Sequence, residues 1–347
     1  MDRQKIAFVE LWRLGDAVAA TAGLRALRAA RPDATIAVVC HPDHGDPLRR
    51  SGDADLTIPF AAFWTRGKRA WDKYLPWTID YAAVAHAWSA LRRFRADLYL
   101  LFRGDAREQL FFSSVGSGRV VDLHWRLSLP GVATVPKVTG VPRFVEYVRA
   151  VSAWSGTASD AMPHVAGIAQ ERTAGRGTVV IHPGASWQYK QWPAANVAAL
   201  DASLTAAGVD TLFVATDADR PFLHAVESAR GRTLPVVFPT LDELYAIIAR
   251  ARAIVCNNSA ALHIAEAVGT PCVALTGSSD PVRWGTYRPD SRTICKSVGL
   301  PCHPCAEKRC VRPDNPCIND IVVTDVLDAL AELGVLGAGV LAGGVTV

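Results

Sequence analysis

Two short polar clusters in the second half of the 347-residue chain combine residue types and spacing that suit phosphate binding. The first, residues 257–263, follows the apolar run 253–256, and the second, residues 277–281, follows the apolar run 272–275. A turn between a strand and a helix presents backbone N–H groups and short hydroxyls, and the helix dipole favours an anion there. The clusters therefore predict a nucleotide-type ligand.

Polar or glycine-containing turns follow four of the strands expected in this half. In open parallel sheets, ligands collect beyond the carboxyl ends of the strands, so these turns outline a nucleotide site. The turns are residues 182–186, 216–217, 257–259 and 277–280. Neither half carries Gly-x-Gly-x-x-Gly in its first turn, and Gly-x-x-x-x-Gly-Lys-Ser/Thr is absent. These absences argue against a dinucleotide dehydrogenase and a P-loop nucleotidase.

Three polar residues of the second half each have a functional and a structural interpretation. Lys190 lies in a loop before a helix, where its ammonium would neutralise a leaving diphosphate; a solvated surface lysine is the alternative. Asn258 is either a ligand contact or a helix N-cap, since Asn is a preferred cap residue. His263, one turn into the same helix, is either a ligand contact or a packing residue.

In the first half, Asp16 is the outstanding carboxylate, because it lies beside Gly15 at the first strand-to-helix turn. One interpretation is an N-cap. The other is a general base that takes the proton from an attacking hydroxyl. Arg103, which ends another expected strand of this half, is a second polar group on the same edge.

Seven of the eight cysteines fall into two sets, and the eighth, Cys295, lies just upstream of the second. Three lie inside apolar strands and are expected to pack as small core residues: Cys40, Cys256 and Cys272. Four form the pattern C-x2-C-x4-C-x6-C: Cys302, Cys305, Cys310 and Cys317. In a reducing cytosol this density favours a thiolate site for Zn or Fe, with a labile disulfide pair and free thiols as alternatives. The metal would be structural and would pin the segment that leads into the last helix.

Strands and helices alternate in both halves, which predicts α/β folding with parallel sheets and helices on their faces. The expected strands are residues 5–11, 35–40, 97–102, 119–123, 178–181, 211–215, 236–238, 253–256 and 272–275. The expected helices are residues 17–30, 79–93, 107–114, 194–207, 220–229, 241–252, 260–268 and 324–333. Thr240 and Glu243 have the spacing of a capping box.

The alternation predicts two doubly wound lobes with a cleft between them. The expected boundaries are a first domain of residues 1–166, a linker of 167–177, a second domain of 178–333 with a Cys-rich loop at 295–317, and a flexible tail of 334–347. An aromatic and cationic insert, residues 60–77, interrupts the first domain. It is either a loop folded onto the sheet edge by its aromatics or a wall that binds sugars and anionic groups.

Composition limits the classes of function. The 37 Lys and Arg residues exceed the 33 Asp and Glu residues by only four, and no basic block stands out, so a nucleic-acid partner is not expected. No stretch has signal-peptide form, and no run of 18 uncharged apolar residues occurs. The expected location is the cytoplasm, with the tail as a candidate contact to a membrane or partner.

Three motifs in order along the chain resemble those of family 9 glycosyltransferases, the lipopolysaccharide heptosyltransferases. The first is Leu14-Gly15-Asp16-x4-Thr21 followed by a helix that ends in Arg31-Pro32-Asp33-Ala34. The second is His182-Pro183-Gly184-Ala185-Ser186 with Lys190-x-Trp192-Pro193. The third is Asn257-x-Ser259 through His263, Gly269-Thr270-Pro271 and Gly277-x-Ser279-Asp280-Pro281. The resemblance covers roughly residues 5–330, and a Cys-rich loop also occurs in this family.

The resemblance implies a glycosyltransferase B fold, in which two Rossmann-like domains face a central cleft. It implies an inverting transfer of heptose from ADP-heptose to a lipopolysaccharide inner-core hydroxyl at the cytoplasmic face of the inner membrane. Asp16 would be the base, and Gly15 and Arg103 would lie on the acceptor side. The donor would contact Ser186, Lys190, Asn258, Ser259, His263, Ser279 and Asp280. Such enzymes generally need no catalytic metal, so positive side chains and helix N-termini would stabilise the departing ADP.

The chain departs from the family pattern at one place. The family usually has Asp-Ser/Thr-Gly where this chain has Asn258-Ser259-Ala260, which removes a charge and adds a methyl group. Altered donor specificity or weak activity would result. Two rival functions are a nucleotide-sugar epimerase of the same fold and a non-catalytic nucleotide-sugar-binding protein that docks through its four-cysteine loop.

Overall fold

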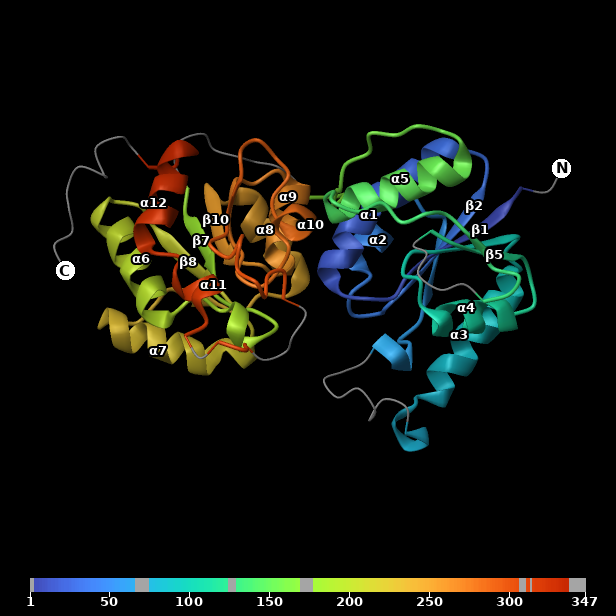
Figure 1. The fold of residues 1–347 in the computed structure, drawn as a ribbon, viewed down its shortest axis with the longest axis horizontal. Helices are drawn as coiled ribbons and strands as arrows, with labels where there is room; N and C mark the ends of the chain where they lie inside the picture. The colour runs from blue at the N-terminus through green and yellow to red at the C-terminus, as the bar shows by residue number, and fades with distance from the viewer. Residues whose placement is uncertain are drawn as a thin grey trace. The chain divides into compact units, whose positions relative to one another are not determined.

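The computed structural model describes residues 3–65, 75–123, 129–168, 177–305, 310–312 and 314–336. The chain divides into two compact units, unit 1 (Met1–Gly167) and unit 2 (Ile168–Val347) (Figure 1). Within the described residues, each unit contains a six-stranded parallel sheet with helices on both faces. The predicted α/β class with parallel sheets is therefore confirmed.

The sheet of unit 1 has the order β3-β2-β1-β4-β5-β6. Its strands are β1 (Lys5–Glu10), β2 (Thr35–Cys40), β3 (Leu56–Pro59), β4 (Leu98–Leu101), β5 (Arg119–Asp122) and β6 (Ala133–Thr134). Ile6 of β1 lies opposite Ile36 of β2 and Leu98 of β4. The central strands are nearly continuous apolar runs because both faces of a parallel sheet are covered.

Five α-helices and two short 3-10 turns accompany this sheet in the described residues. They are α1 (Leu14–Ala30), α2 (Asp46–Arg50), η1 (Phe63–Thr65), η3 (Pro76–Thr78), α3 (Tyr81–Phe94), α4 (Ala106–Ser114) and α5 (Arg143–Ser155). Helices α1 and α5 pack against each other (Figure 1). Gly23 of α1 permits this contact, since a Cβ there would lie 2.7 Å from the Cβ of Tyr147 on α5. The close packing brings Tyr147 within reach of the carboxyl end of β1.

The aromatic insert is partly described, and its described part packs into the core of unit 1. Phe60 and Trp64 are buried, and the ring of Phe60 stacks on Phe111 of α4 at 4.7 Å. The packing interpretation is confirmed for these two residues. Trp77, by contrast, is 79% exposed. The cationic part of the insert, residues 66–74, lies outside the described residues.

The sheet of unit 2 has the order β12-β11-β10-β7-β8-β9. Its strands are β7 (Val179–His182), β8 (Thr211–Val214), β9 (Val236–Val237), β10 (Ala253–Asn257), β11 (Cys272–Leu275) and β12 (Arg292–Ile294). Its helices and 3-10 turns are η4 (Gln188–Lys190), α6 (Ala194–Ala206), η5 (Asp217–Asp219), α7 (Arg220–Arg230), α8 (Leu241–Arg250), α9 (Ala260–Val268), α10 (Pro281–Trp284), α11 (Pro316–Asn319) and α12 (Val323–Glu332). Helices α6, α7 and α12 form one layer, and α8 packs on α9 in the other.

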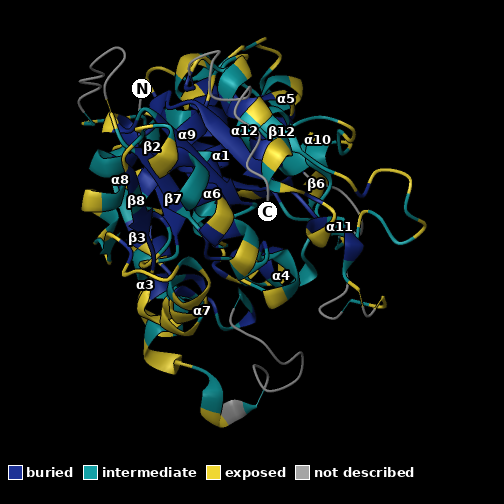
Figure 2. Cartoon of the chain, turned by 90° about the vertical axis from the view of Figure 1, so that its left-hand side faces the viewer, coloured by how far each residue is buried: buried dark blue, intermediate teal, exposed yellow. Residues whose placement is uncertain are grey.

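Both sheets are buried between their helices, and the exposed residues gather on outer helix faces such as those of α3 and α7 (Figure 2). The predicted capping box of Thr240 and Glu243 at α8 is confirmed. The predicted core cysteines are also confirmed: Cys40, Cys256 and Cys272 are at most 1% exposed. Among the described helices, none has the length and apolar character needed to cross a bilayer.

Several elements are not among those expected from the sequence. Strands β3, β6 and β12 lie at or near sheet edges and are short, which weakens their pattern. Helix α5 is also unexpected. Its buried face carries Arg143 and Glu146 beside apolar residues, so the sequence lacks the continuous apolar pattern that indicates a core-facing helix.

Each sheet has the strand order of a Rossmann-like doubly wound domain, in which the chain reverses direction across the sheet once. The reversal lies between β1 and β4 in unit 1 and between β7 and β10 in unit 2. Ligands bind such sheets outside the carboxyl ends of the strands at this switch point. The residues that follow these four strands are therefore the candidates for function.

Candidate functional site

In unit 1, three charged side chains meet at the switch point between β1 and β4. Glu10 is the last residue of β1, Arg103 follows β4, and Asp16 lies in the first turn of α1. The Arg103 Nη2 atom lies 3.3 Å from Glu10 Oε1 and 2.7 Å from Asp16 Oδ1. The side chain of Glu10 is fully buried. Arg103 thus bridges two carboxylates from different elements.

The N-cap interpretation of Asp16 is wrong. Arg13 occupies the N-cap position of α1, and Gly15 and Asp16 are the second and third residues of the helix. At the third position the Asp16 carboxylate lies against the guanidinium groups of Arg103 and Arg143. Its negative charge also lies at the positive end of the helix dipole.

A second guanidinium reaches Asp16 from α5. Arg143 Nε lies 3.6 Å from Asp16 Oδ1, while Arg143 Nη1 pairs with Glu146 at 2.5 Å. Arg143 Nη2 donates to the Tyr147 hydroxyl at 2.8 Å, and that hydroxyl donates to Glu10. The network closes on itself, so each of these buried charges has at least one partner of opposite sign or a hydrogen bond.

Burial and charge together set the protonation states of this network. Burial opposes the charge of Arg103, but Asp16 and Glu10 outweigh it and raise the pKa of the guanidinium. Burial, followed by the charge of Glu10, raises the pKa of Glu108 on α4 to about 8. Glu108 Oε1 accepts a hydrogen bond from the Trp12 indole at 3.0 Å. Glu108 is therefore a neutral acid at pH 7 beside ionised groups.

Asp16, Gly15 and Arg103 are predicted from the sequence, whereas Glu10, Glu108, Arg143 and Tyr147 are not. Two signals point to the missed residues. Glu10 is a single carboxylate directly after the buried apolar residues 6–9 of β1, where only a functional or paired charge is expected. Arg143, Glu146 and Tyr147 share one helix face through their spacing of three and four residues.

In unit 2, Lys190 and Ser279 come together from distant parts of the sequence. The Lys190 Nζ atom donates to the Ser279 hydroxyl at 2.9 Å. Burial lowers the pKa of Lys190, and its ammonium lies 5.7 Å from the centre of the Trp187 ring. The interpretation of Lys190 as a freely solvated surface lysine is therefore wrong. A partly desolvated ammonium gains strongly from an anionic ligand.

At the switch point of unit 2, Asn257 ties two loops together. Its Nδ2 atom donates to the carbonyl of Pro183 at 2.7 Å, and its Oδ1 atom accepts from the backbone N–H of Trp192 at 3.2 Å. Next to it, the Ser259 hydroxyl lies 3.5 Å from His182 Nδ1. Burial lowers the pKa of His182, so the ring is neutral.

The N-cap interpretation of Asn258 is also wrong, because Ser259 is the N-cap of α9. The Asn258 side chain instead donates to the carbonyl of Trp284 at 2.8 Å. His263 packs edge-to-face on the Trp284 ring at 5.9 Å. Both residues thus support Trp284 at the end of α10.

The remaining residues of the predicted donor set lie in two loops. Asp280 caps α10, accepting from the backbone N–H groups of Val282 at 2.9 Å and Arg283 at 3.3 Å. Ser186 is exposed in the loop after β7. In unit 2 the structure therefore brings Lys190 and Ser279 into direct contact, while Asn258, His263 and Asp280 are engaged in holding the local structure.

In the Cys-rich segment (residues 295–317), Cys302, Cys305 and Cys310 lie close enough to Cys317 to influence its thiol. Burial raises the pKa of the Cys317 thiol to about 11, and the charges of Cys310, Cys302 and Cys305 add to the increase. Yet no three His, Cys, Asp or Glu side chains of the described residues are arranged to hold a metal ion. The donor set suits Zn or Fe by its chemistry, and the metal stays a prediction.

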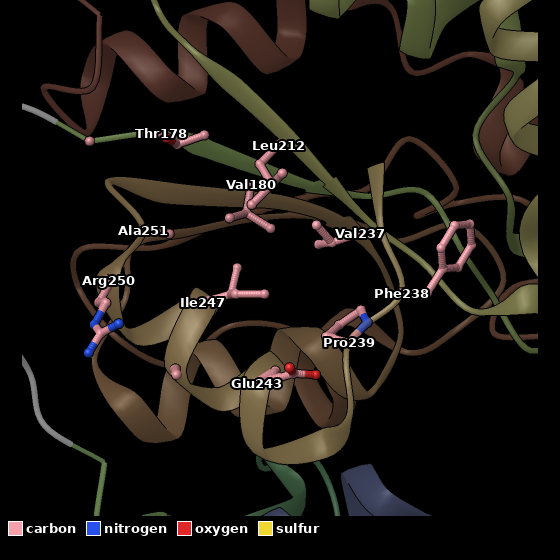
Figure 3. A pocket seen from close by; sticks show the side chains of 12 residues that line it. Thr178, Val180, Leu212, Val237, Phe238, Pro239, Glu243, Ile247, Arg250 and Ala251 are labelled. Carbon is pink, nitrogen blue, oxygen red and sulfur yellow. The ribbon is translucent and has the colours of Figure 1, made fainter. Parts of the chain in front are cut away.

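A groove of about 580 Å³ lies elsewhere on unit 2, between α8 and the face formed by β7, β8 and β9. Figure 3 shows apolar side chains from both sides of it: Val180, Leu212, Val237 and Ile247. Its lining includes neither Lys190 nor Ser279. The groove is therefore separate from the polar carboxyl edge of the sheet.

Sequence comparison identifies similar proteins for the second half of the chain. Residues 150–314 match the model of glycosyltransferase family 9 (heptosyltransferase). Lipopolysaccharide heptosyltransferase 3 of Escherichia coli is 34% identical over 116 residues, which is 32% of this chain. The match spans 34% of that relative, so about a third of its length is represented here.

Structure comparison covers nearly the whole chain. The E. coli ADP-heptose lps heptosyltransferase II is similar with a TM-score of 0.71 and 18% identity, over 95% of this chain and 98% of that chain. The iron-containing dodecameric glycosyltransferase TibC from enterotoxigenic E. coli is similar with a TM-score of 0.55 and 14% identity, over 96% of this chain and 77% of that chain. With its two Rossmann-like sheets, the chain has the predicted glycosyltransferase B fold.

Proposed function

We propose, from the match of residues 150–314 to the model of glycosyltransferase family 9, that the protein is an inverting glycosyltransferase that uses ADP-heptose. The acceptor would be a hydroxyl group of a lipopolysaccharide inner core or a related glycan. The observation that carries the proposal is the pairing of Lys190 with Ser279 at the carboxyl edge of the family 9 segment. Two relatives are heptosyltransferases by name, and one of them is named for ADP-heptose.

Lys190 and the loops around it would bind the ADP moiety. The ammonium would pair with the diphosphate and stabilise its charge as it departs. Because Lys190 is partly desolvated and the described residues place no carboxylate within 4 Å of it, an anion would be its first ionic partner there. Ser259 at the start of α9 and Asp280 at the start of α10 lie in the same set of turns. Ser186, Asn258 and His263 complete the proposed donor side.

Asp16 would act as the general base. Direct inversion at the anomeric carbon requires one carboxylate that takes the proton from the attacking acceptor hydroxyl. The two guanidinium groups of Arg103 and Arg143 favour the ionised carboxylate, which is the form that accepts a proton. They also fix its position, so that the acceptor oxygen meets the carboxylate in one orientation. Gly15 and Arg103 would flank the acceptor.

The Cys-rich segment would bind a metal ion with a structural role. Its four thiolates would hold Zn or Fe, and such an ion would stabilise the local fold without entering the reaction. The structurally similar TibC is an iron-containing glycosyltransferase, which makes iron a metal to test for. Elemental analysis of anaerobically purified protein should give close to one equivalent of Zn or Fe per chain. A content below about 0.2 equivalents would refute the proposed metal site.

A donor screen followed by a transfer assay tests the proposed function. The melting temperature should rise with ADP and ADP-sugars more than with UDP-, GDP- or CDP-sugars, since a ligand that binds only the folded form stabilises it. With ADP-heptose and a lipopolysaccharide core that lacks its outer heptose, mass spectrometry should detect one added heptose. NMR of the product should show inverted anomeric configuration.

Controls separate the rival functions. Incubation with labelled ADP-heptose alone should leave the sugar unchanged, whereas conversion without acceptor would identify an epimerase. Tight ADP binding without transfer to any core acceptor would identify a non-catalytic binding protein. No stabilisation by any nucleotide sugar would refute the proposal.

A further inference from the structure

The Cys-rich segment contacts the turn of Gly277, Ser278 and Ser279 through three hydrogen bonds, one to each successive carbonyl. The buried Ser297 hydroxyl donates to the carbonyl of Gly277 at 2.6 Å. The backbone N–H of Cys305 donates to the carbonyl of Ser278 at 2.8 Å. His303 Nε2 lies 3.1 Å from the carbonyl of Ser279. Since a carbonyl only accepts, Nε2 of His303 carries the proton in this contact.

These three bonds fix the direction of the backbone N–H groups in the turn. In a planar trans peptide the N–H points opposite to the C=O of the same unit, and the three units concerned are trans. The N–H groups of Ser278, Ser279 and Asp280 are therefore turned away from the Cys-rich segment. No described residue accepts a hydrogen bond from any of the three. Successive N–H groups of this kind bind anions.

The Cys-rich segment also holds the loop that carries Lys190. Asn315 Nδ2 donates to the carbonyl of Tyr189 at 3.3 Å, directly before Lys190. Nearby, a Cβ on Gly277 would lie 3.3 Å from both the carbonyl oxygen and the Sγ atom of Cys317. A glycine at this position therefore lets the segment approach the turn closely. Both partners of the Lys190–Ser279 contact are thus supported from one side.

We propose that His303, Ser297 and the Cys305 backbone are positioning groups for the donor diphosphate. They hold the carbonyls of the 277–279 turn on one side, which presents three N–H groups and the Ser279 hydroxyl, beside Lys190, to the anion. This inference rests on the proposed function of the same site. The Cys-rich segment thereby has a second role besides holding the last helix in place. The last helix is held by a separate contact, in which Lys296 Nζ pairs with Asp325 of α12 at 2.8 Å.

His303 is the variant of choice, because it is half-buried whereas Ser297 is fully buried. The dissociation constant for ADP is measured by calorimetry, and the melting temperature of each variant is measured in parallel. His303→Ala should weaken ADP binding about tenfold, the worth of one hydrogen bond that orders a ligand site. His303→Gln, whose amide can donate to the same carbonyl, should recover most of the affinity.

Two substitutions in the same segment serve as matched controls. Val298→Ala alters a side chain that is 70% exposed, and Lys296→Ala breaks the contact with Asp325. Both should keep ADP affinity within about twofold of the wild type, the scale of substitutions that remove no ligand-site contact. Lys296→Ala should lower only the melting temperature.

The outcomes distinguish this inference from the proposed function. If the wild type binds ADP and His303→Ala binds it equally well, the positioning role is refuted while the proposed function stands. A loss of affinity equal in His303→Ala and Lys296→Ala would show a general structural effect and would also refute it. If the wild type binds no nucleoside diphosphate, the proposed function fails first and this inference falls with it.

Discussion

At the carboxyl edge of unit 1, Asp16 is surrounded by ionised side chains that are buried and mutually paired. At the corresponding edge of unit 2, Lys190 contacts a hydroxyl, Ser279, and the neighbouring groups are backbone N–H and small polar side chains. The two sheets have the same strand order, so the fold does not account for the difference. Side chains that cross from neighbouring elements do: Arg143 from α5 in unit 1, and the Cys-rich segment in unit 2.

The two edges are prepared for a ligand in different ways. In unit 1, opposite charges satisfy one another and fix one carboxylate in place. In unit 2, hydrogen bonds on one side of a turn leave donors on the other side without protein acceptors among the described residues. The first arrangement suits proton transfer at a fixed point, and the second suits binding of an anion that brings its own charge. Substitutions at each edge should therefore affect different measured quantities.

The largest expected effect concerns Asp16. Asp16→Asn keeps the shape of the side chain but removes its ability to accept a proton. Turnover should fall by about 10²- to 10⁴-fold, the usual worth of a general base. ADP affinity measured by calorimetry should be unchanged. Wild-type turnover in this variant would remove Asp16 from the mechanism.

The next effect concerns stability and activity at Glu10. Glu10→Gln removes one carboxylate that Arg103 and Tyr147 contact in the fully buried network. Breaking a buried charge pair from one side costs about 3 kcal/mol of unfolding free energy. Chemical denaturation should show this loss, and turnover should fall as well because Arg103 positions Asp16.

Asp201 of unit 2 is the matched control for Glu10. It is equally buried and pairs with Arg230 and Arg232, both at 2.8 Å, but lies on α6 away from the carboxyl edge. Asp201→Asn should lower stability by a similar amount and leave turnover per folded molecule unchanged. Equal losses of activity in both variants would mean that Glu10 acts only through stability.

Lys190 should show a smaller effect, on binding. Lys190→Met should weaken ADP binding by about 10- to 100-fold, as expected for loss of a charged hydrogen-bond donor. Burial lowers the pKa of Lys190, and the protonated form is the one that binds an anion. In the wild type, ADP affinity should therefore decline with rising pH already below the ordinary lysine pKa of 10.5, and in Lys190→Met this part of the pH dependence should vanish. A variant that binds ADP as the wild type does would exclude contact with the diphosphate.

The last effect concerns Glu108 and appears only with pH. Its folded-state pKa of about 8 exceeds the ordinary value of 4.5, so between these values the folded protein holds a proton that the unfolded chain has lost. Its contribution to stability is full below pH 4.5 and is lost as pH rises through 8. Glu108→Gln stays neutral, so its melting temperature should match the wild type near pH 5 and exceed it near pH 9. If the melting temperatures of the two proteins differ by the same amount at pH 5 and at pH 9, the raised pKa of Glu108 is contradicted.

Much of the fold could be predicted from the sequence because parallel strands and their helices leave local signals. The range predicted for β2, residues 35–40, and that for α9, residues 260–268, match the structure without error. Helix α5 could not be recognised in this way, since its buried face carries Arg143 and Glu146. A pattern of apolar residues finds a core-facing helix only when the inward positions are apolar.

In the candidate site, too, single residues could be recognised from the sequence, whereas their contacts could not. Asp16, Lys190 and Ser279 were visible as polar residues at strand ends, where local position suggests function. Their partners were not visible, because contacts such as Lys190 with Ser279 join residues 89 positions apart. The cap assignments of Asp16 and Asn258 were wrong by three positions and one position, since helix starts depend on tertiary contacts as well as on cap preference.

By itself, the sequence determined the alternation of strands and helices and the polar turns at the strand ends, because hydrophobic period and turn chemistry are local properties. Tertiary structure alone decided that Arg103 and Arg143 converge on Asp16 and that the Cys-rich segment binds the carbonyls of residues 277–279, which turns the N–H groups of residues 278–280 away from it. The reason is physical: charge pairing and hydrogen-bond direction depend on distances across elements, and these are set only when the sheets and helices pack.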